Sequence, residues 1–194
     1  IPVFPRRLFS LGQVFVNTRS SFFHPRELAG RTIGLQSFQT TLAVLAKGDM
    51  AAEYGLDLRS VRWLTRSAET VEVAPAPGFR VERMPPGLGL IEALVQGEVD
   101  AIFYSRTPWS DPDPGLPIRR LFADPEAEES RYYAKNGHWP IMHLVVLKKV
   151  LAEGRPELPM QLMRAFESAH RIANSYIADP GWSRLAWTKY TRES

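Results

Sequence analysis

The chain has 194 residues, and 24 Lys and Arg side chains against 21 Asp and Glu side chains give a net charge of +3 with His neutral. A chain of this length can bury a core as one large domain or as two lobes, without a disulfide or a metal. The absence of cysteine excludes disulfide frameworks, thiolate metal sites and a cysteine nucleophile. With 44% hydrophobic and 23% charged residues, the composition also excludes a disordered or fibrous chain.

The basic residues are dispersed, singly or in pairs such as Arg6-Arg7 and Arg119-Arg120. A nucleic-acid-binding protein usually gathers them on one stripe or helix, so we expect no nucleic-acid partner. Arginine suits bidentate recognition of a carboxylate, which favours a small anionic ligand. No apolar run approaches the roughly 18 residues of a membrane span, so we expect none.

Strand-like and helix-like segments alternate in the first half of the chain. Residues 24–30 read as one helical turn, and the apolar spacing of Leu42, Ala46 and Met50 predicts a helix that ends at Gly55. A second helix is expected over residues 89–96, with Gly97 as its terminating glycine. The expected strands are residues 14–16, 31–35, 61–64, 79–82 (an edge strand) and 99–104.

The second half of the chain begins with an irregular loop over residues 108–117, which contain four prolines. Residues 141–147 form an apolar run that predicts a strand. Residues 160–177 predict a long helix that docks on a sheet through one stripe, formed by Leu162, Phe166, Ala169, Ala173 and Tyr176.

The alternation of strands and helices predicts an α/β fold with a mixed, mostly parallel sheet and helices on both faces. Two strand-like segments, near the start of the chain and at residues 141–147, flank a complete α/β block. We therefore expect two lobes: residues 1–20 and 141–194 form lobe 1, and residues 21–140 form lobe 2. The chain opens at Ile1 without a methionine, and we expect lobe 1 to lack its N-terminal part.

Several local strings together resemble one enzyme family. They are Phe15-Val16-Asn17-Thr18-Arg19, Glu27-Leu28-Ala29-Gly30-Arg31-Thr32-Ile33-Gly34, Gln39-Thr40-Thr41, Glu98-Val99-Asp100-Ala101 and Tyr132-Tyr133…Gly137-His138-Trp139-Pro140-Ile141-Met142-His143. In this order, and over nearly the whole chain, they resemble the 4,5-dihydroxyphthalate decarboxylase family, which is similar in fold to type II periplasmic solute-binding proteins. The last string is the most selective of them.

The resemblance implies two lobes around a ligand cleft and decarboxylation of an aromatic ortho-dicarboxylate without a cofactor. For such a decarboxylase we expect a cytoplasmic location. The alternative is a solute-binding protein of an ABC-type transporter, which would close on a small organic anion in the periplasm. An oligomer is compatible with either reading, and the sequence names neither the substrate nor the oligomeric state.

The loop over residues 37–41 follows a strand and opens a helix, where backbone N–H groups favour an anion. We expect Ser37, Thr40 and Thr41 to contact the ligand there. The competing interpretation is a simple helix cap by Ser37 or Thr40, and one loop can serve both purposes.

Two arginines are candidates to clamp a carboxylate, because each follows a predicted strand. They are Arg19 and Arg106, and Arg106 is favoured because Tyr104 and Ser105 precede it. We also expect Tyr104 and Ser105 to contact the ligand. We expect Arg106, together with Arg19 and the Thr40-Thr41 helix start, to hold the carboxylate that the substrate retains.

Histidine is the natural proton carrier near neutral pH, and His143 ends the most selective string. We expect His143 to deliver the proton, although a packed core histidine is the ordinary alternative. His138 and Trp139 are expected to contact the ligand. Two imidazoles without a third ligand make a poor metal site, so we expect no metal.

Overall fold

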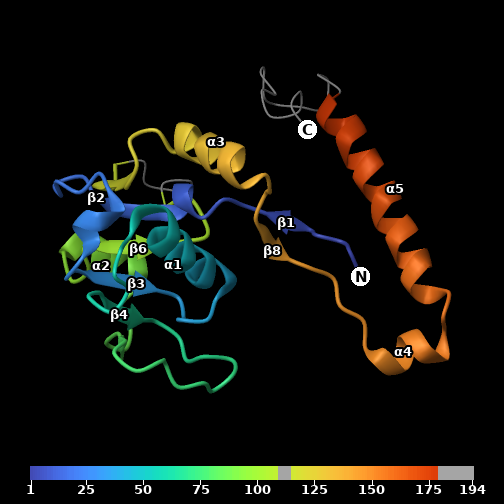
Figure 1. The fold of residues 1–194 in the computed structure, drawn as a ribbon, viewed down its shortest axis with the longest axis horizontal. Helices are drawn as coiled ribbons and strands as arrows, with labels where there is room; N and C mark the ends of the chain where they lie inside the picture. The colour runs from blue at the N-terminus through green and yellow to red at the C-terminus, as the bar shows by residue number, and fades with distance from the viewer. Residues whose placement is uncertain (109–114, 179–194) are drawn as a thin grey trace. The chain divides into compact units, whose positions relative to one another are not determined.

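The computed structural model describes residues 1–108 and 115–178 (Figure 1). The chain divides into two compact units. Unit 1 takes Ile1–Arg6 and the chain from His143 onward, and unit 2 is Arg7–Met142. Strands β1 (Arg6–Arg7) and β8 (Ile141–His143) form a two-stranded sheet.

Unit 2 contains a six-stranded sheet in the order β5-β4-β3-β6-β2-β7. The pairs β3–β4, β3–β6 and β4–β5 are parallel, whereas β2 is antiparallel to both β6 and β7. The strands are β2 (Val14–Asn17), β3 (Thr32–Leu35), β4 (Arg62–Thr65), β5 (Arg80–Arg83), β6 (Ala101–Phe103) and β7 (Ile118–Arg120). The expected mixed, mostly parallel sheet is confirmed, and β5 lies at its edge as predicted.

The sheet separates two hydrophobic clusters because successive side chains of a strand point to opposite faces. In β6, Ala101 and Phe103 join the cluster beneath α1 (Thr41–Tyr54), whereas Ile102 joins the cluster beneath α2 (Leu90–Gln96). Trp63 and Leu64 of β4 divide in the same way. The helices therefore cover both faces, as the α/β pattern predicts.

Local signals set the ends of these helices. The Thr40 side chain accepts a hydrogen bond from the Ala43 N–H at the start of α1. Gly55 ends α1 with φ +68° and Gly97 ends α2 with φ +82°, a left-handed conformation that favours glycine. Shorter 3₁₀ turns occupy η1 (Leu11–Gln13) and η2 (Pro25–Leu28), the second within the expected turn at 24–30.

Helix α3 (Pro125–Asn136) was not expected from the sequence. It buries only Tyr132, so it carries no apolar stripe. Polar contacts attach it instead: the Gly12 N–H donates to the Glu129 carboxylate at 3.1 Å, and the Tyr54 hydroxyl donates to Glu128 at 2.6 Å. A search for hydrophobic periodicity misses a helix of this kind.

Strand β2 belongs to unit 2, although it lies within the residues 1–20 that are expected in lobe 1. It pairs with β6 in register Val14↔Phe103 and Val16↔Ala101, inside the sheet of unit 2. Its residues are buried on both faces, which requires cover from both helical layers. The wider division into lobes stays a prediction.

Unit 1 contains α4 (Lys149–Gly154) and α5 (Leu158–Ala178). The long helix is confirmed. No residue is buried in the described part of this unit, and docking of the helix stripe on a sheet stays a prediction. The strand expected over residues 141–147 is shorter in the structure, where β8 ends at His143. Of the loop expected over residues 108–117, positions 109–114 lie outside the described residues.

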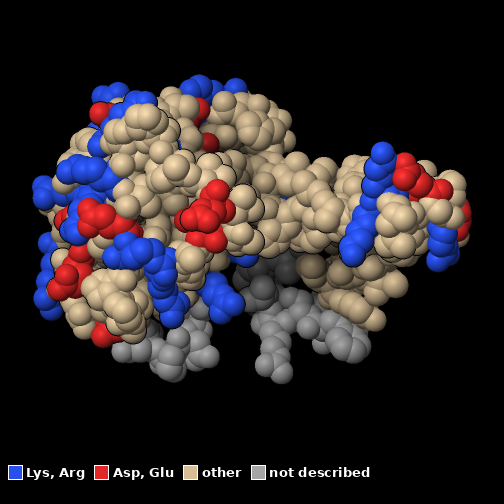
Figure 2. All heavy atoms as spheres, turned by 90° about the horizontal axis from the view of Figure 1, so that it is seen from below, with Lys and Arg blue, Asp and Glu red and all other residues tan. Residues whose placement is uncertain are grey.

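Acidic and basic side chains are interspersed over the face shown in Figure 2. Figure 2 shows blue and red groups side by side on that face. Among the described residues, the exposed side chains of Arg62 and Glu82 form an ion pair whose nearest N and O atoms are 2.7 Å apart. This face therefore carries no single-sign stripe of the kind that a nucleic-acid backbone requires.

Candidate functional site

Four parallel strands, β5, β4, β3 and β6, end at the same edge of the sheet, which we call the carboxyl edge. Residues 36–41 leave β3 there, residues 66–69 leave β4 and residues 104–106 leave β6. Open α/β sheets bind their ligands outside the carboxyl ends of the strands. The carboxyl edge is therefore where the topology of unit 2 favours a ligand.

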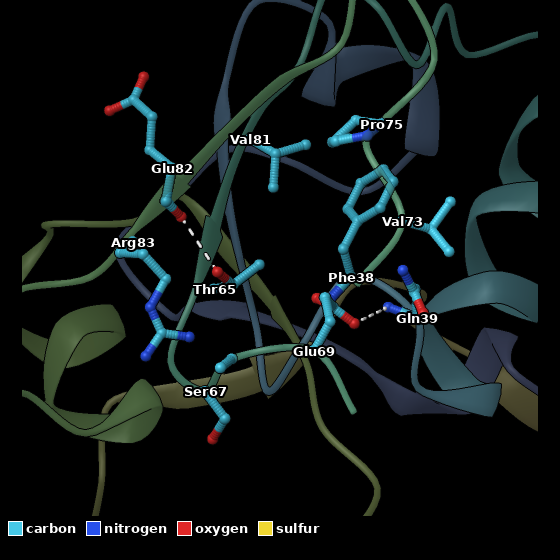
Figure 3. A pocket seen from close by; sticks show the side chains of 11 residues that line it. Phe38, Gln39, Thr65, Ser67, Glu69, Val73, Pro75, Val81, Glu82 and Arg83 are labelled. Atoms are coloured by element: carbon cyan, nitrogen blue, oxygen red, sulfur yellow. Dashed lines mark hydrogen bonds between the residues drawn. The ribbon is translucent and has the colours of Figure 1, made fainter. Parts of the chain in front are cut away.

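A hollow of about 210 Å³ opens at this edge beside β3, β4 and β5 (Figure 3). Figure 3 shows apolar groups of Phe38, Val73 and Pro75 on one side, and Arg83 and Ser67 on another. A cavity of about 150 Å³ accommodates benzene, so this hollow has room for one substituted ring. The lining residues are Phe38, Gln39, Thr65, Ser67, Ala68, Glu69, Val73, Pro75, Val81, Glu82 and Arg83.

Glu69 fixes the loop in front of α1. Its carboxylate accepts hydrogen bonds from the backbone N–H groups of Phe38, at 2.5 Å, and Gln39, at 3.0 Å (Figure 3 draws the second). These donors lie in the loop where the sequence predicted a bound anion, so a carboxylate of the chain itself occupies them. No sequence signal identified Glu69, because it comes from the segment after β4, 30 residues away.

Lys47 holds the same loop from the helix side. Its ammonium donates to the Phe38 carbonyl at 2.8 Å and lies 3.0 Å from the centre of the Phe38 ring. Burial lowers the pKa of Lys47 to about 8, and the Glu69 carboxylate opposes that shift. The Phe38 peptide is thus held at its N–H by an anion and at its C=O by a cation.

A sequence signal for Lys47 does exist. The residues Ala43, Lys47, Met50 and Tyr54 follow the spacing of one helix face, and all four are buried. A lysine within such a stripe indicates a buried cation that requires a partner.

Ser37, Thr40 and Thr41 lie at the carboxyl edge, as their place before α1 implies. Ser37 is buried, Thr40 is half-buried and Thr41 is exposed. The capping role of Thr40 is confirmed by its bond with the Ala43 N–H. Contact of these three residues with a ligand remains a prediction.

Tyr104, Ser105 and Arg106 reach the same edge at the end of β6, the neighbour of β3. The Tyr104 N–H donates to the Gln13 carbonyl at 3.0 Å, which fixes the start of this segment. The side chains of Ser105 and Arg106 are exposed. The structure therefore brings Arg106 and the opening of α1 to one edge of one sheet.

Arg19 does not lie at the carboxyl edge. Strand β2 is antiparallel to β6, so the end of β2 lies beside the start of β6. The bond from the Asn17 side-chain amide to the Leu94 carbonyl, at 3.3 Å, fixes that end against the last turns of α2. Arg19 therefore follows the edge opposite to Arg106. That the two share a carboxylate stays a prediction, which this topology does not favour.

His138 and Trp139 lie in a different cluster from the hollow. The His138 ring nitrogen Nε2 is 3.4 Å from the Tyr132 hydroxyl, and the Trp139 and Phe9 ring centres are 5.1 Å apart. Neither residue is among those that line the hollow. The packing with Tyr132 and Phe9 accounts for both residues without a ligand, so ligand contact by either stays a prediction.

Beneath this cluster lies the carboxyl group of Asp49. It is buried, accepts a hydrogen bond from the Ser10 hydroxyl, and has a raised pKa because burial penalises its charged form. The same burial, together with the nearby Asp49, raises the pKa of Tyr132 to about 12. At neutral pH the Tyr132 hydroxyl therefore keeps its proton.

His143 is the last residue of β8 and its side chain is exposed. It belongs to unit 1, whereas Arg106 belongs to unit 2. Its role as proton donor remains a prediction.

Within 1–108 and 115–178, no group of three or more His, Asp or Glu side chains is arranged to hold a metal ion. In the same ranges, no helix combines the length and the apolar character needed to cross a bilayer.

Comparison with known proteins gives two similar decarboxylases, and no protein-family profile matches the chain. A 4,5-dihydroxyphthalate decarboxylase of Comamonas testosteroni is 31% identical over an alignment of 193 positions that covers 95% of this chain and 58% of that protein. A protein of the same name from Pseudomonas putida is 25% identical over an alignment of 139 positions that covers 69% of this chain and 54% of that protein. The chain thus spans little more than half the length of these relatives.

The similarity extends along almost the whole chain, over both the α/β block and the segments that flank it. It confirms the resemblance that the local strings indicated. The chain is a homologue of 4,5-dihydroxyphthalate decarboxylase.

Proposed function

We propose that this chain is the ligand-binding part of a decarboxylase that acts without a cofactor on a small aromatic carboxylate resembling 4,5-dihydroxyphthalate. The observation that carries the proposal is the ring-sized hollow at the carboxyl edge of unit 2. It occurs in a chain whose two relatives bear the name of that decarboxylase. The apolar groups around Phe38 suit the face of an aromatic ring.

The carboxylate that the substrate retains requires fixed cationic or N–H donors. Arg83 lines the hollow, and Arg106 follows the neighbouring parallel strand at the same edge. Thr40 and Thr41 stand at the N-terminus of α1, where the helix dipole favours an anion. In this proposal these groups hold the carboxylate that the substrate retains, and Arg19 takes no part.

In the proposed reaction the bond between the ring and one carboxyl carbon breaks, and its electron pair stays on the ring carbon. That carbon receives a proton, and the carboxylate leaves as carbon dioxide. The ring hydroxyl groups donate electron density to the ring. Because both electrons of the broken bond stay on the ring carbon, the reaction requires no external oxidant or reductant. His143 is the proton donor in this proposal, since imidazole exchanges protons near neutral pH.

The two arginines offer a matched binding test. Arg19→Ala and Arg106→Ala each remove one exposed guanidinium that follows a strand of the same sheet, at opposite edges. Calorimetric titration with 4,5-dihydroxyphthalate should show affinity about 10- to 100-fold lower for Arg106→Ala, the effect of losing a charged hydrogen bond. Arg19→Ala should bind like the unchanged chain. Equal losses in both variants would contradict the assignment.

Turnover is measured as carbon dioxide released from 4,5-dihydroxyphthalate. The chain is supplemented for this assay with the part of the Comamonas testosteroni protein that lies outside the similarity. His143→Ala should abolish release while leaving affinity unchanged. Tight binding without any release by the unchanged protein would favour the alternative, a solute-binding protein for a small organic anion.

A further inference from the structure

Three charged side chains line the hollow at the carboxyl edge: Glu69, Glu82 and Arg83. The Glu69 carboxylate accepts the backbone N–H groups of Phe38 and Gln39. Both oxygens of Glu82 accept hydrogen bonds from the Arg62 guanidinium, at 2.7 to 3.2 Å. Figure 3 shows the Glu82 carboxylate directed away from the hollow. Groups of the chain itself therefore bind both carboxylates.

The guanidinium of Arg83 has no such partner. Within residues 1–108 and 115–178 it makes no hydrogen bond or ion pair, and the residue is exposed. Successive side chains of a strand point to opposite faces, so Val81 and Arg83 share one face of β5 and Glu82 takes the other. Thr65 of β4 is the register partner of Arg83, and both line the hollow. The sheet thus places one unpaired cation at the hollow.

The two carboxylates of the proposed substrate have different fates, although the symmetry of 4,5-dihydroxyphthalate makes them chemically equivalent. One leaves as carbon dioxide and loses its negative charge, whereas the other keeps its charge throughout. An ion pair with the leaving carboxylate would be stronger before the reaction than in the transition state, so it would slow the reaction. An ion pair with the retained carboxylate secures binding without that cost.

We propose that Arg83 orients the substrate in the hollow by pairing with the carboxylate that is retained. The carboxylate that leaves then has no cationic partner among the lining groups, so Arg83 decides which of the two equivalent groups is lost. A guanidinium suits this task because its planar N–H groups bind both oxygens of one carboxylate. This inference rests on the proposed function and adds the orientation of the substrate to it.

The orientation has a consequence for the product. Loss of one carboxylate from 4,5-dihydroxyphthalate, with a proton in its place, gives 3,4-dihydroxybenzoate. The product keeps the retained carboxylate, so it should keep the contact with Arg83. Arg83 should therefore contribute equally to the affinities of substrate and product.

Calorimetric titration of the 194-residue chain tests this with three ligands: 4,5-dihydroxyphthalate with two carboxylates, 3,4-dihydroxybenzoate with one and catechol with none. Arg83→Gln removes the charge, and Arg83→Lys keeps the charge without the planar fork. Both replace an exposed side chain that makes no bond in the described chain, so both variants should fold. Arg66→Gln is the matched control, because Arg66 follows β4 at the same edge, is exposed and does not line the hollow.

We expect Arg83→Gln to bind both carboxylate ligands about 10- to 100-fold more weakly, by the same factor, and to bind catechol like the unchanged chain. Arg83→Lys should fall between Arg83→Gln and the unchanged chain. Arg66→Gln should change each affinity by less than about threefold.

Three patterns would overturn the orientation while the proposed function stands. In the first, Arg83→Gln weakens only 4,5-dihydroxyphthalate, which would place Arg83 on the leaving carboxylate. In the second, it weakens none of the ligands, and in the third it weakens catechol as well. If the unchanged chain binds none of the three ligands, the proposed function itself fails and the orientation fails with it.

Discussion

The two units of this chain differ in what they bury, although their sequences have similar apolar patterns. In unit 2, Trp63 is fully buried and two hydrophobic clusters lie on opposite faces of the sheet. In the described part of unit 1 no side chain is buried, and Phe166 is 40% exposed. An apolar stripe thus predicts a surface that can pack, whereas packing itself requires a partner surface.

The proposed ligand-binding groups and the proposed proton donor belong to different units. The hollow, the loop before α1 and Arg106 all belong to unit 2, which supplies its own core. The expected proton donor His143 belongs to unit 1. Ligand binding and proton transfer should therefore differ in how strongly they depend on sequence outside this chain.

The largest expected effect is on the core of unit 2. Trp63→Ala removes a ring that contacts those of Phe38 and Phe103, with centre distances of 5.9 and 6.0 Å. The resulting cavity should lower the free energy of unfolding by about 3–5 kcal/mol, measured by urea denaturation. A loss below about 1 kcal/mol would show that this cluster is not the stable core.

A smaller loss of unfolding free energy is expected for a substitution at the carboxyl edge. Glu69→Ala leaves the backbone N–H groups of Phe38 and Gln39 without their acceptor, which should cost about 1–3 kcal/mol of unfolding free energy. The same variant should bind 4,5-dihydroxyphthalate more weakly, because the loop before α1 is no longer fixed. Glu72→Ala, an exposed carboxylate on the same segment, is the control and should change neither quantity. Matching effects in the two variants would contradict the role of Glu69.

Lys47 gives a dependence on pH whose sign is fixed by its lowered pKa. The group releases its proton at about pH 8 in the folded chain and near pH 10.5 when unfolded. The unfolded state therefore binds more protons between these values, and the free energy of unfolding should rise with pH there, by at most about 1.4 kcal/mol per pH unit.

Urea denaturation at pH 7.5 and pH 9.5 measures this rise. Lys47→Met removes the titrating group, so the variant should lack the rise. Tyr54 and Tyr132 have raised pKa values and act in the opposite direction only at higher pH. Identical pH profiles for the unchanged chain and the variant would exclude Lys47 as the source.

The smallest effect is expected in unit 1. Phe166→Ala should change the free energy of unfolding of the chain alone by less than about 0.5 kcal/mol, because the ring is not buried there. The same urea titration that measures Trp63→Ala gives this value. A loss as large as that of Trp63→Ala would mean that α5 already packs within the chain.

The sequence predicted the features of this fold that depend on local signals. The cap at Thr40, the stops at Gly55 and Gly97, and the alternation of strands and helices all agree with the structure. Helix α3 was missed because Glu128 and Glu129, and not an apolar stripe, attach it to the unit.

The candidate site was predicted less completely because it depends on contacts between distant segments. The direction of β2, which removes Arg19 from the carboxyl edge, is set by its pairing with β6 about 86 residues later. Glu69 bonds to the loop before α1 from a position 31 residues after Phe38. Only Lys47 is indicated by a local pattern, because it is a charged residue within an apolar stripe of its helix.

Amide hydrogen exchange along the 194-residue chain tests the contrast between the units most directly. The amides of β3, β4 and β6 should be protected to the level of global unfolding, whereas those of α5 should exchange with little protection. The α5 amides should become protected when the remaining segment of the Comamonas testosteroni protein is added. Protection of α5 equal to that of β3 in the chain alone would contradict the account.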